Sequence, residues 1–305
     1  LTRAYYHPIH ITGAADSDIE NTHIYRVRII DPGEQAIKIN PSTELHYADR
    51  GVIECSHLEL TDSGRPEIRN NCYTGGVDAH AAWDWEIRDN KIIGFWCDAG
   101  LSEHGIHLWR TCRGTLVERN HILDCARGIG FGLSATAGGN VREYPDDPYP
   151  SSGYLDHIDG IIRNNFISAS SAALYASSSG VDSGISLAQA RGAQVYHNTV
   201  AFTDTPFCAV EWRFENTDAV IANNLVTHNL MPRNGAQAAL DGNLEGASLD
   251  LFVDGAGGDL HVDPSAAGAD SVLGSGAELA PGLCDEDIDG EPRNQPPDIG
   301  ADEVD

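Results

Sequence analysis

Apolar and polar positions recur along this chain in a fixed order. Five segments carry apolar residues, then polar residues, then asparagine, then further apolar residues: 85–92, 116–122, 160–167, 194–200 and 220–226. A second short apolar stretch begins about fourteen residues before the asparagine, as from Gly76 to Asn90 and from Ala209 to Asn223. The chain is therefore built from repeats of short strands.

Repeats of this kind predict a solenoid of β coils. Units of roughly 20 to 30 residues with two or three short strands stack at the spacing of about 4.8 Å between neighbouring strands. Asparagine suits the recurring turn because it tolerates left-handed backbone, and its amide can bond the asparagine of the next coil. We predict an all-β chain that forms one single-stranded, right-handed parallel β-helix over residues 1–305. A β-sandwich is the alternative, but it gives no reason for asparagine at a constant position.

The repeat is interrupted once, by residues 134–159, which we predict to be a loop insertion. Long loops on a rigid scaffold commonly carry function, and Tyr149 and Tyr154 in this one are candidates for stacking on sugars. Residues 285–305 are expected to close the C-terminal end. Because Leu1 already belongs to a strand-like stretch, we expect an N-terminal coil or leader to be missing.

Alternation along each upstream strand assigns its side chains to two faces. Apolar residues such as Val77 and Ile106 take the inward positions. The first outward column contains Asp78, His107, Gly130, Ser186 and Glu211. The second contains His80, Trp109, Gly132, Ala188 and Arg213. Continuing the register upstream places Lys38 beside Asp78, and we expect both columns to face solvent.

These columns mix small residues with reactive ones, which is typical of a binding groove. Gly130 and Gly132 would form a floor that a bulky substrate approaches closely. Trp109 would stack on a sugar ring. Glu211 and Arg213 would contact the substrate or pair with each other across the face. The pattern favours a polysaccharide as the partner.

The repeat pattern resembles that of bacterial parallel β-helix proteins of the pectate-lyase-like kind, and the ending DIDGEPRNQPPDIGADE resembles their closing coil. Asp78, Ala79 and His80 also resemble the D-P-H signature of mannuronan C5-epimerases, which act on uronate polysaccharides from the same fold. Ala79 stands where that signature has proline, and the nearest tyrosine is Tyr73. The resemblance implies an extracellular or periplasmic protein with a catalytic groove around Asp78 and His80.

Lyases and epimerases of uronates both remove the proton at C5, next to the carboxylate. They need a base, an acid and a group that neutralises the carboxylate. His80 and His107 are candidates for base or acid, and Lys38 is a further candidate base. Arg110 or Arg213 would neutralise the carboxylate by a bidentate contact.

Asp78 and Glu103 are candidate ligands for Ca²⁺, which prefers oxygen donors. The net charge of −27 favours divalent cations and disfavours nucleic acid or an anionic membrane surface. No run of eighteen apolar residues occurs, so membrane insertion is not expected. Seven cysteines allow at most three disulfides, and the candidate pairs are Cys55 with Cys72 and Cys97 with Cys125, unless these are free thiols.

The leading hypothesis is a polysaccharide lyase or C5-epimerase. A β-helix glycoside hydrolase is the first alternative, because two carboxylates that flank the bond suffice. The second alternative is a non-catalytic glycan-binding or adhesive β-helix that uses Trp109 and the loop tyrosines.

Overall fold

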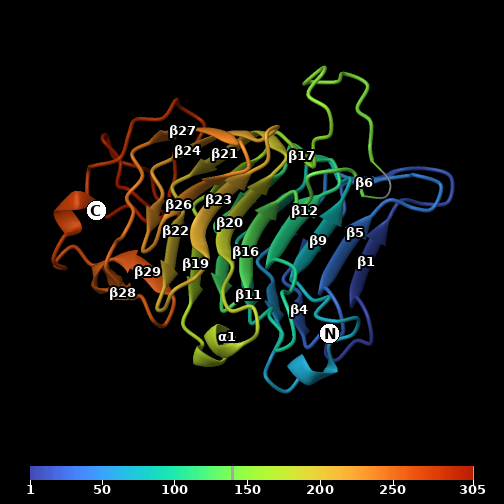
Figure 1. Ribbon diagram of the computed structural model, residues 1–305, viewed down its shortest axis with the longest axis horizontal. Coiled ribbons are helices and arrows are strands. Elements are labelled where there is room, and N and C mark those ends of the chain that lie inside the picture. The colour runs from blue at the N-terminus through green and yellow to red at the C-terminus, as the bar shows by residue number, and fades with distance from the viewer. Residues whose placement is uncertain (139–140, 305) are drawn as a thin grey trace.

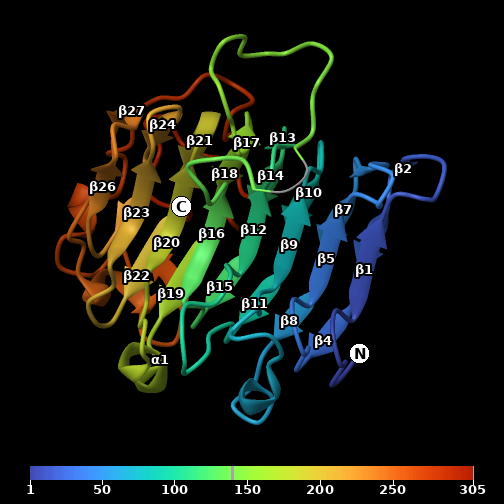
Figure 2. The same ribbon diagram turned by 45° about the vertical axis from the view of Figure 1, so that its right-hand side comes forward.

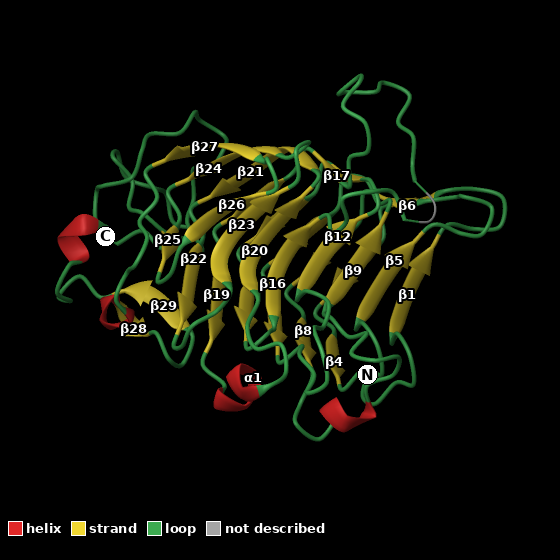
Figure 3. Ribbon diagram, in the orientation of Figure 1, coloured by secondary structure: helices red, strands yellow, loops and turns green. Residues whose placement is uncertain are grey.

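The computed structural model describes residues 1–138 and 141–304, and nearly all of the regular structure in them is β-strand (Figure 3). Three parallel sheets run along the molecule, and successive coils lie side by side from the N-terminus to the C-terminus (Figure 1). The predicted all-β class and parallel β-helix are confirmed. No helix among the described residues has the length and apolar character needed to cross a membrane.

Most coils contribute one strand to each sheet, and the coils that begin with β12 and β16 contribute two strands to the ten-stranded sheet. The eight-stranded sheet contains β1 (Ile9–Thr12), β5 (Ile37–Asn40), β9 (Val77–His80), β12 (Ile106–Trp109), β16 (Arg127–Phe131), β20 (Ser183–Ala188), β23 (Cys208–Arg213) and β26 (Leu230–Arg233). The seven-stranded sheet contains β4 (Arg28–Ile30), β8 (His57–Glu59), β11 (Lys91–Ile93), β15 (His121–Leu123), β19 (Phe166–Ala169), β22 (Thr199–Phe202) and β25 (Leu225–Val226).

The ten-stranded sheet is the third wall of the solenoid. It contains β3 (His23–Tyr25), β7 (Val52–Glu54), β10 (Glu86–Arg88), β13 (Cys112–Arg113), β14 (Leu116–Glu118), β17 (His157–Ile158), β18 (Ile161–Arg163), β21 (Ala190–Tyr196), β24 (Asp218–Ala222) and β27 (Gln237–Asp241). The remaining elements are the pair β2 (Ile19–Glu20) and β6 (Ala48–Asp49), the antiparallel pair β28 (Phe252–Asp254) and β29 (Asp259–Val262), helix α1 (Ala172–Ala176), and the 3₁₀ turns Arg65–Glu67, Leu249–Leu251 and Ala269–Ser271.

Strand register in the eight-stranded sheet brings the predicted columns together (Figure 2). Asp78 pairs with Lys38 on the strand before it and with His107 on the strand after it. His80 lies opposite Trp109. The first column then continues through Gly130, Ser186 and Glu211. The alignment predicted from the repeat is therefore confirmed, including its extension to Lys38.

A ladder of asparagines joins the coils on the other side of the solenoid. Asn120 Oδ1 accepts the backbone N–H of Asn90 at 3.1 Å and its side-chain amide at 3.0 Å. The same exchange links all the rungs, which are Asn90, Asn120, Asn165, Asn198, Asn224 and Asn243. The predicted inter-coil amide bonds are confirmed.

The ladder differs from the prediction in one position. Asn224, not Asn223, occupies the rung, while Asn223 donates its amide to His197 at 2.8 Å. The reason is that the left-handed backbone belongs to the residue before each rung, as φ values of 58° at Asp89 and 58° at Asn223 show. The rung asparagine is selected for its hydrogen bonds and not for its tolerance of positive φ.

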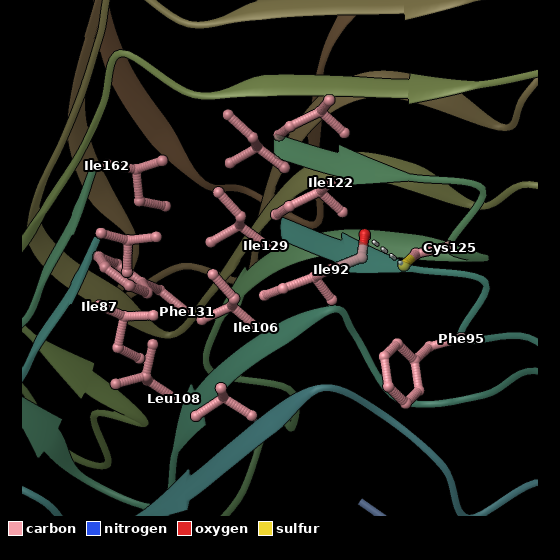
Figure 4. Packing of buried hydrophobic residues seen from close by; sticks show 14 of the residues in the cluster. Ile87, Ile92, Phe95, Ile106, Leu108, Ile122, Cys125, Ile129, Phe131 and Ile162 are labelled. Atoms are coloured by element: carbon pink, nitrogen blue, oxygen red, sulfur yellow. Dashed lines mark hydrogen bonds between the residues drawn. The ribbon is translucent and has the colours of Figure 1, made fainter. Parts of the chain in front are cut away.

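Aliphatic side chains fill the interior in stacks, with similar residues above one another in successive coils (Figure 4). The stack shown there includes Ile87 and Ile162 of the ten-stranded sheet, Ile92 and Ile122 of the seven-stranded sheet, and Ile106 and Ile129 of the eight-stranded sheet. Burial of such apolar surface stabilises a fold by about 25 cal/mol per Å². Because each layer repeats the same shape, this core keeps the coils in register.

The predicted loop insertion at 134–159 ends in β17, which belongs to the ten-stranded sheet, and its described part before β17 extends beyond the coils (Figures 1 and 2). Its described part is tied to the solenoid by Arg142, whose two terminal nitrogens each donate to Asp49 at 2.7 Å. Tyr144 also donates its hydroxyl to the carbonyl of Thr111 at 2.8 Å. These contacts fix the base of the insertion next to the turn that follows β12.

The described part of the closing segment 285–305 packs its Ile288 and Ile299 into a second apolar cluster at the C-terminal end. Buried Asp287 accepts the backbone N–H groups of Asp289, Glu291 and Glu303. This carboxylate therefore organises a turn through backbone hydrogen bonds.

The disulfide joins Cys72 to Cys97, so both pairs predicted from the sequence are wrong. The turns before β9 and β12 bring these two residues to a Cα separation of 5.5 Å. Cys125 instead packs as a thiol in the core, where burial raises its pKa to about 12. Cys55 remains an exposed thiol.

The ladder yields a stability prediction. Asn120→Ala removes buried bonds to Asn90, Asn165 and the backbone, so we expect a loss of about 3 kcal/mol or more in the free energy of unfolding in urea. The control is Asn294→Ala at an exposed position, which should change that free energy by less than about 0.5 kcal/mol. Equal effects of the two substitutions would contradict a stabilising ladder.

Candidate active site

The candidate site lies on the outward face of the eight-stranded sheet, where β5, β9 and β12 run side by side (Figure 2). Lys38 and Asp78 face each other across two adjacent strands, and the Lys38 ammonium forms an ion pair with the Asp78 carboxylate. The ammonium also donates to the hydroxyl of Tyr73 at 3.1 Å and to Nε2 of His80 at 2.8 Å. All three of its hydrogens are therefore in use.

Asp78 is held from both sides. One carboxylate oxygen accepts from Lys38, and the other accepts the indole N–H of Trp109 at 2.8 Å. His107 Nδ1 lies 3.8 Å from that second oxygen. Because both oxygens already have donors, the structure does not support Asp78 as a ligand of Ca²⁺.

Burial differs from the prediction that the columns face solvent. Asp78 and His107 are completely buried, and Lys38 is 5% exposed. The cause is the turns before β9 and β12, because Tyr73 and His104 from those turns contact the column residues. On the side of His80, the site reaches solvent at partly buried side chains, namely Tyr73, His80, Trp109 and Arg110.

Charge in the cluster follows from these contacts. Burial alone would lower the pKa of Lys38, but the charge of Asp78 and the contact with Tyr73 raise it above its ordinary value. Burial alone would raise the pKa of Asp78, yet Lys38 and His80 hold it well below its ordinary value. Both groups are thus ionised near neutral pH. Lys38 serves as a hydrogen-bond donor, so its predicted role as the base does not fit.

His80 is the neutral member of the cluster. Burial lowers the pKa of its imidazole. An ammonium only donates, so Nε2 accepts from Lys38 and the ring proton is on Nδ1. His80 therefore presents an N–H donor and not a lone pair. Burial also raises the pKa of Tyr73, which keeps its hydroxyl protonated near neutral pH.

Arg110 follows Trp109 at the end of β12, and its guanidinium lies 4.6 Å from the indole centroid. Among the described arginines, only Arg26, Arg69 and Arg110 have no carboxylate within 4.0 Å. Its Nε is buried without a hydrogen-bond partner, and its charge contributes to the lowered pKa of His80. Arg110 is thus an uncompensated cation beside the open part of the cluster.

Other predicted substrate contacts have structural roles. A Cβ atom on Gly130 would lie 2.5 Å from Nε2 of His104, so this glycine makes room for that ring and does not form a groove floor. Gly132 has φ of 75°, and a Cβ there would lie 1.9 Å from the carbonyl oxygen of Ala188. Both glycines are required by packing, which corrects their predicted role.

Trp109 also differs from the prediction. Its ring stacks on His107 with centroids 5.0 Å apart and an interplanar angle of 8°. Part of the ring surface that a sugar would need is therefore covered within the protein. The indole N–H, bonded to Asp78, fixes the orientation of that carboxylate.

Glu211 and Arg213 lie further along the columns and are engaged with neighbours. Glu211 pairs with Arg233 at 2.6 Å and with Arg213 at 3.9 Å. Arg213 donates to the carbonyl of Leu133 at 2.9 Å. The predicted alternative of a same-face ion pair is therefore what forms.

One of the loop tyrosines lies close to the end of β12, because the Tyr154 hydroxyl and the backbone N–H of Arg110 both donate to Oδ1 of Asp156. Tyr154 donates to Asp156 at 2.6 Å, and Tyr149 bonds Asp159. With Tyr144 they line a cavity of about 360 Å³ within the insertion, whose described lining contains no column residue.

Among the described residues, two clusters have donor atoms spaced for a metal ion. One contains Glu103, His104 and His107, and the other contains His261, Asp289 and Asp302. The sequence identified Glu103 and His107, but not His104 or Tyr73. The repeat carries no signal for them because both lie in turns of unequal length between strands.

No family model matches the chain, and no curated protein matches it. Among solved structures, it is similar to the crystal structure of PfbA, a surface adhesin of Streptococcus pneumoniae, with a TM-score of 0.43 and 12% sequence identity. The match covers 80% of this chain and 60% of that one.

The ion pair yields a prediction. Lys38→Met or Asp78→Asn leaves one charge buried and unpaired, so each should lower the free energy of unfolding by about 3 to 5 kcal/mol. The double variant should lose less than the sum, because neither charge then remains. Urea unfolding measures all three. Additive losses would contradict a coupled pair.

The pH dependence of that loss has a defined sign. The lowered pKa of Asp78 means that its contribution is present above the unfolded value of about 3.9 and is lost as pH falls below it. The raised pKa of Lys38 means that its contribution is present below about 10.4 and is lost at higher pH. The difference in the free energy of unfolding between wild type and the double variant, which carries neither charge, should therefore be constant from about pH 5 to pH 9.

Proposed function

We propose that this protein is a carbohydrate-active enzyme that acts on a uronate-containing polysaccharide by removing the C5 proton, as a lyase or a C5-epimerase. The proposal rests on the position of the Arg110 guanidinium, which lies beside the solvent-accessible side of His80 and Trp109. This guanidinium has no carboxylate partner among the residues that the structure describes. The Lys38–Asp78 ion pair is buried beneath this surface, where it is held in a fixed position at low dielectric constant.

Arg110 would bind the uronate carboxylate. A protein with a net charge of −27 repels a polyanion in general, so binding needs a local cation that no internal acid neutralises. Arg110 meets that requirement, and a guanidinium can make two parallel hydrogen bonds to a carboxylate. Neutralising the carboxylate also stabilises the negative charge that develops when the C5 proton leaves.

Tyr73 and His80 would transfer the protons. In its ionised form, Tyr73 would accept the C5 proton, and its hydrogen bond from Lys38 would stabilise the phenolate. His80 would donate its Nδ1 proton, either to the C4 oxygen as the C4–O bond breaks or to the opposite face of C5. After the reaction, Nδ1 of His80 would regain a proton from solvent and Tyr73 would release one to solvent, while the hydrogen bonds from Lys38 to Nε2 of His80 at 2.8 Å and to Tyr73 at 3.1 Å are kept.

Asp78 would be a positioning residue in this scheme. It orients Lys38 and the Trp109 indole and does not reach solvent. The sequence resemblance of Asp78 and His80 to the D-P-H signature of mannuronan C5-epimerases supports the proposal, and Tyr73 supplies the tyrosine at a different position. The Cys72–Cys97 disulfide supports an extracellular or periplasmic location, because such bonds persist in oxidising compartments.

The second candidate function is glycan binding without catalysis. Two observations favour it: the Lys38–Asp78 cluster satisfies its own charges, and the insertion holds a separate cavity lined by tyrosines. A glycoside hydrolase has less support, since both oxygens of Asp78 are engaged by donors and neither is free to act on a glycosidic bond.

The test is an activity screen on uronate and neutral polysaccharides. We expect unsaturated uronate ends, detected by their ultraviolet absorbance, or a changed uronate composition at constant chain length. Arg110→Gln should lower kcat/KM by about 10²-fold or more, because the carboxylate loses its charged partner. Arg26→Gln is the matched control, since Arg26 is exposed and also has no acidic partner.

Retention of uronate glycans on an affinity gel without any product would favour the binding function instead. Reducing ends without unsaturation would favour a hydrolase. An Arg110→Gln variant as active as Arg26→Gln would contradict the assigned carboxylate site.

The proposal also predicts an alkaline pH profile. Tyr73 must lose its proton to act as the base, and its pKa is raised by burial above the ordinary value of about 10. We therefore expect kcat/KM to rise about tenfold per pH unit up to at least pH 9. Tyr73→Phe should abolish this rise together with the activity. A flat profile between pH 6 and 9 in the wild type would exclude Tyr73 as the base.

A further inference from the structure

We propose that Glu103, His104 and His107 bind a divalent transition metal ion, with zinc as the best-fitting probe. One donor atom from each residue lies within 4.8 Å of those of the other two. Glu103 and His104 come from the turn before β12, and His107 comes from β12 itself. This site goes beyond the proposed sugar chemistry and does not depend on it.

Three buried polar atoms at this place have no hydrogen-bond partner: Glu103 Oε2, His104 Nδ1 and His107 Nδ1. Both histidines are fully buried, at 1% and 0% exposure. Buried polar atoms without partners are costly, and three of them on side chains whose metal-binding atoms lie this close are rare in a stable fold. A cation that coordinates all of them removes the cost at once.

The other ring nitrogen of each histidine is already bound. His107 Nε2 lies 3.3 Å from the carbonyl oxygen of Gly132, and a carbonyl only accepts, so Nε2 carries the proton. In neutral His107, Nδ1 is then a lone pair. His104 Nε2 forms a hydrogen bond with the hydroxyl of Ser186 at 2.9 Å. The Nδ1 atom of His104 is therefore the nitrogen that can bind a metal ion. Such outer hydrogen bonds are typical of histidines that bind metal.

The spacing of the donors fits a shared ion. Glu103 Oε2 and His107 Nδ1 are 3.0 Å apart, but their geometry is not that of a hydrogen bond. Two ligands at about 2.1 Å from one ion and at angles near 90–110° are separated by about 3.0 to 3.4 Å. A carboxylate oxygen and a lone pair at this distance repel each other unless a proton or a cation lies between them.

Ligand chemistry selects the class of metal. Two imidazoles and one carboxylate suit zinc and other first-row transition ions, whereas Ca²⁺ takes six to eight oxygen ligands. Asp78 adds a nearby negative charge, with an oxygen 3.8 Å from His107 Nδ1. Gly130 is needed because any Cβ there would collide with the His104 ring. The glycine in the column thus keeps a ligand in place.

The alternative to a metal is a proton. A doubly protonated His107 would form an ion pair with Glu103 and would require no ion. The two cases differ in what the purified protein binds and in the protonation of the His107 ring.

The experiment uses the full chain after treatment with a chelator, titrated with ZnSO₄ by calorimetry and followed by thermal unfolding. We expect one zinc ion per chain at this site and a raised Tm. Glu103→Gln and His107→Gln should each weaken zinc binding at least tenfold, and Co²⁺ in place of zinc should give visible absorption bands typical of nitrogen ligation.

His261→Gln is the matched control, because His261 belongs to the second cluster, with Asp289 and Asp302. It should leave the affinity of the first site unchanged. Absence of zinc binding by the wild type, or equal binding by wild type and Glu103→Gln, would overturn the proposal. So would nitrogen NMR that finds His107 protonated on both nitrogens in the presence of zinc. None of these measurements involves a polysaccharide. They therefore test the zinc site even if the proposed enzyme activity is not found.

Discussion

Parallel stacking of coils in exact register is the constraint on which the rest of this structure depends. Each coil places one residue directly above its equivalent in the coil before, so that a position in the repeat becomes a column on the surface. Two sets of contacts hold that register: the asparagine ladder at the turns and the aliphatic stacks in the interior. Lys38, Asp78 and His107 are adjacent only because three separate coils agree in register.

This constraint explains what the sequence could predict. The repeat predicted the strand positions and the inward or outward direction of their side chains. Aligning equivalent positions of successive repeats therefore predicted Lys38 and His107 as the neighbours of Asp78. It could not reveal burial, because that depends on turns whose lengths differ from coil to coil. Tyr73 and His104 come from such turns and cover part of the column. For the same reason, the sequence predicted Gly130 as the floor of a groove, whereas in the structure this glycine makes room for the His104 ring.

The site combines a buried pair of opposite charges with one arginine that has no acidic partner among the described residues. The chain is strongly acidic, and most of its arginines are paired with carboxylates, as Arg142 is with Asp49. Within the cluster, Lys38 and Asp78 neutralise each other and leave His80 neutral between a cation and the solvent. Arg110 alone supplies free positive charge at the open side. In the proposed function, a substrate carboxylate would therefore be bound by this single side chain, while the buried pair would hold Tyr73 and His80 in place.

The most direct measurement is a crystal structure of the protein with a bound uronate oligosaccharide. A sugar carboxylate should lie within hydrogen-bond distance of the Arg110 guanidinium, and C5 of the same sugar should lie next to Tyr73 and His80. An oligosaccharide seated in the tyrosine-lined cavity of the insertion, with Arg110 left without contact, would contradict the proposed function.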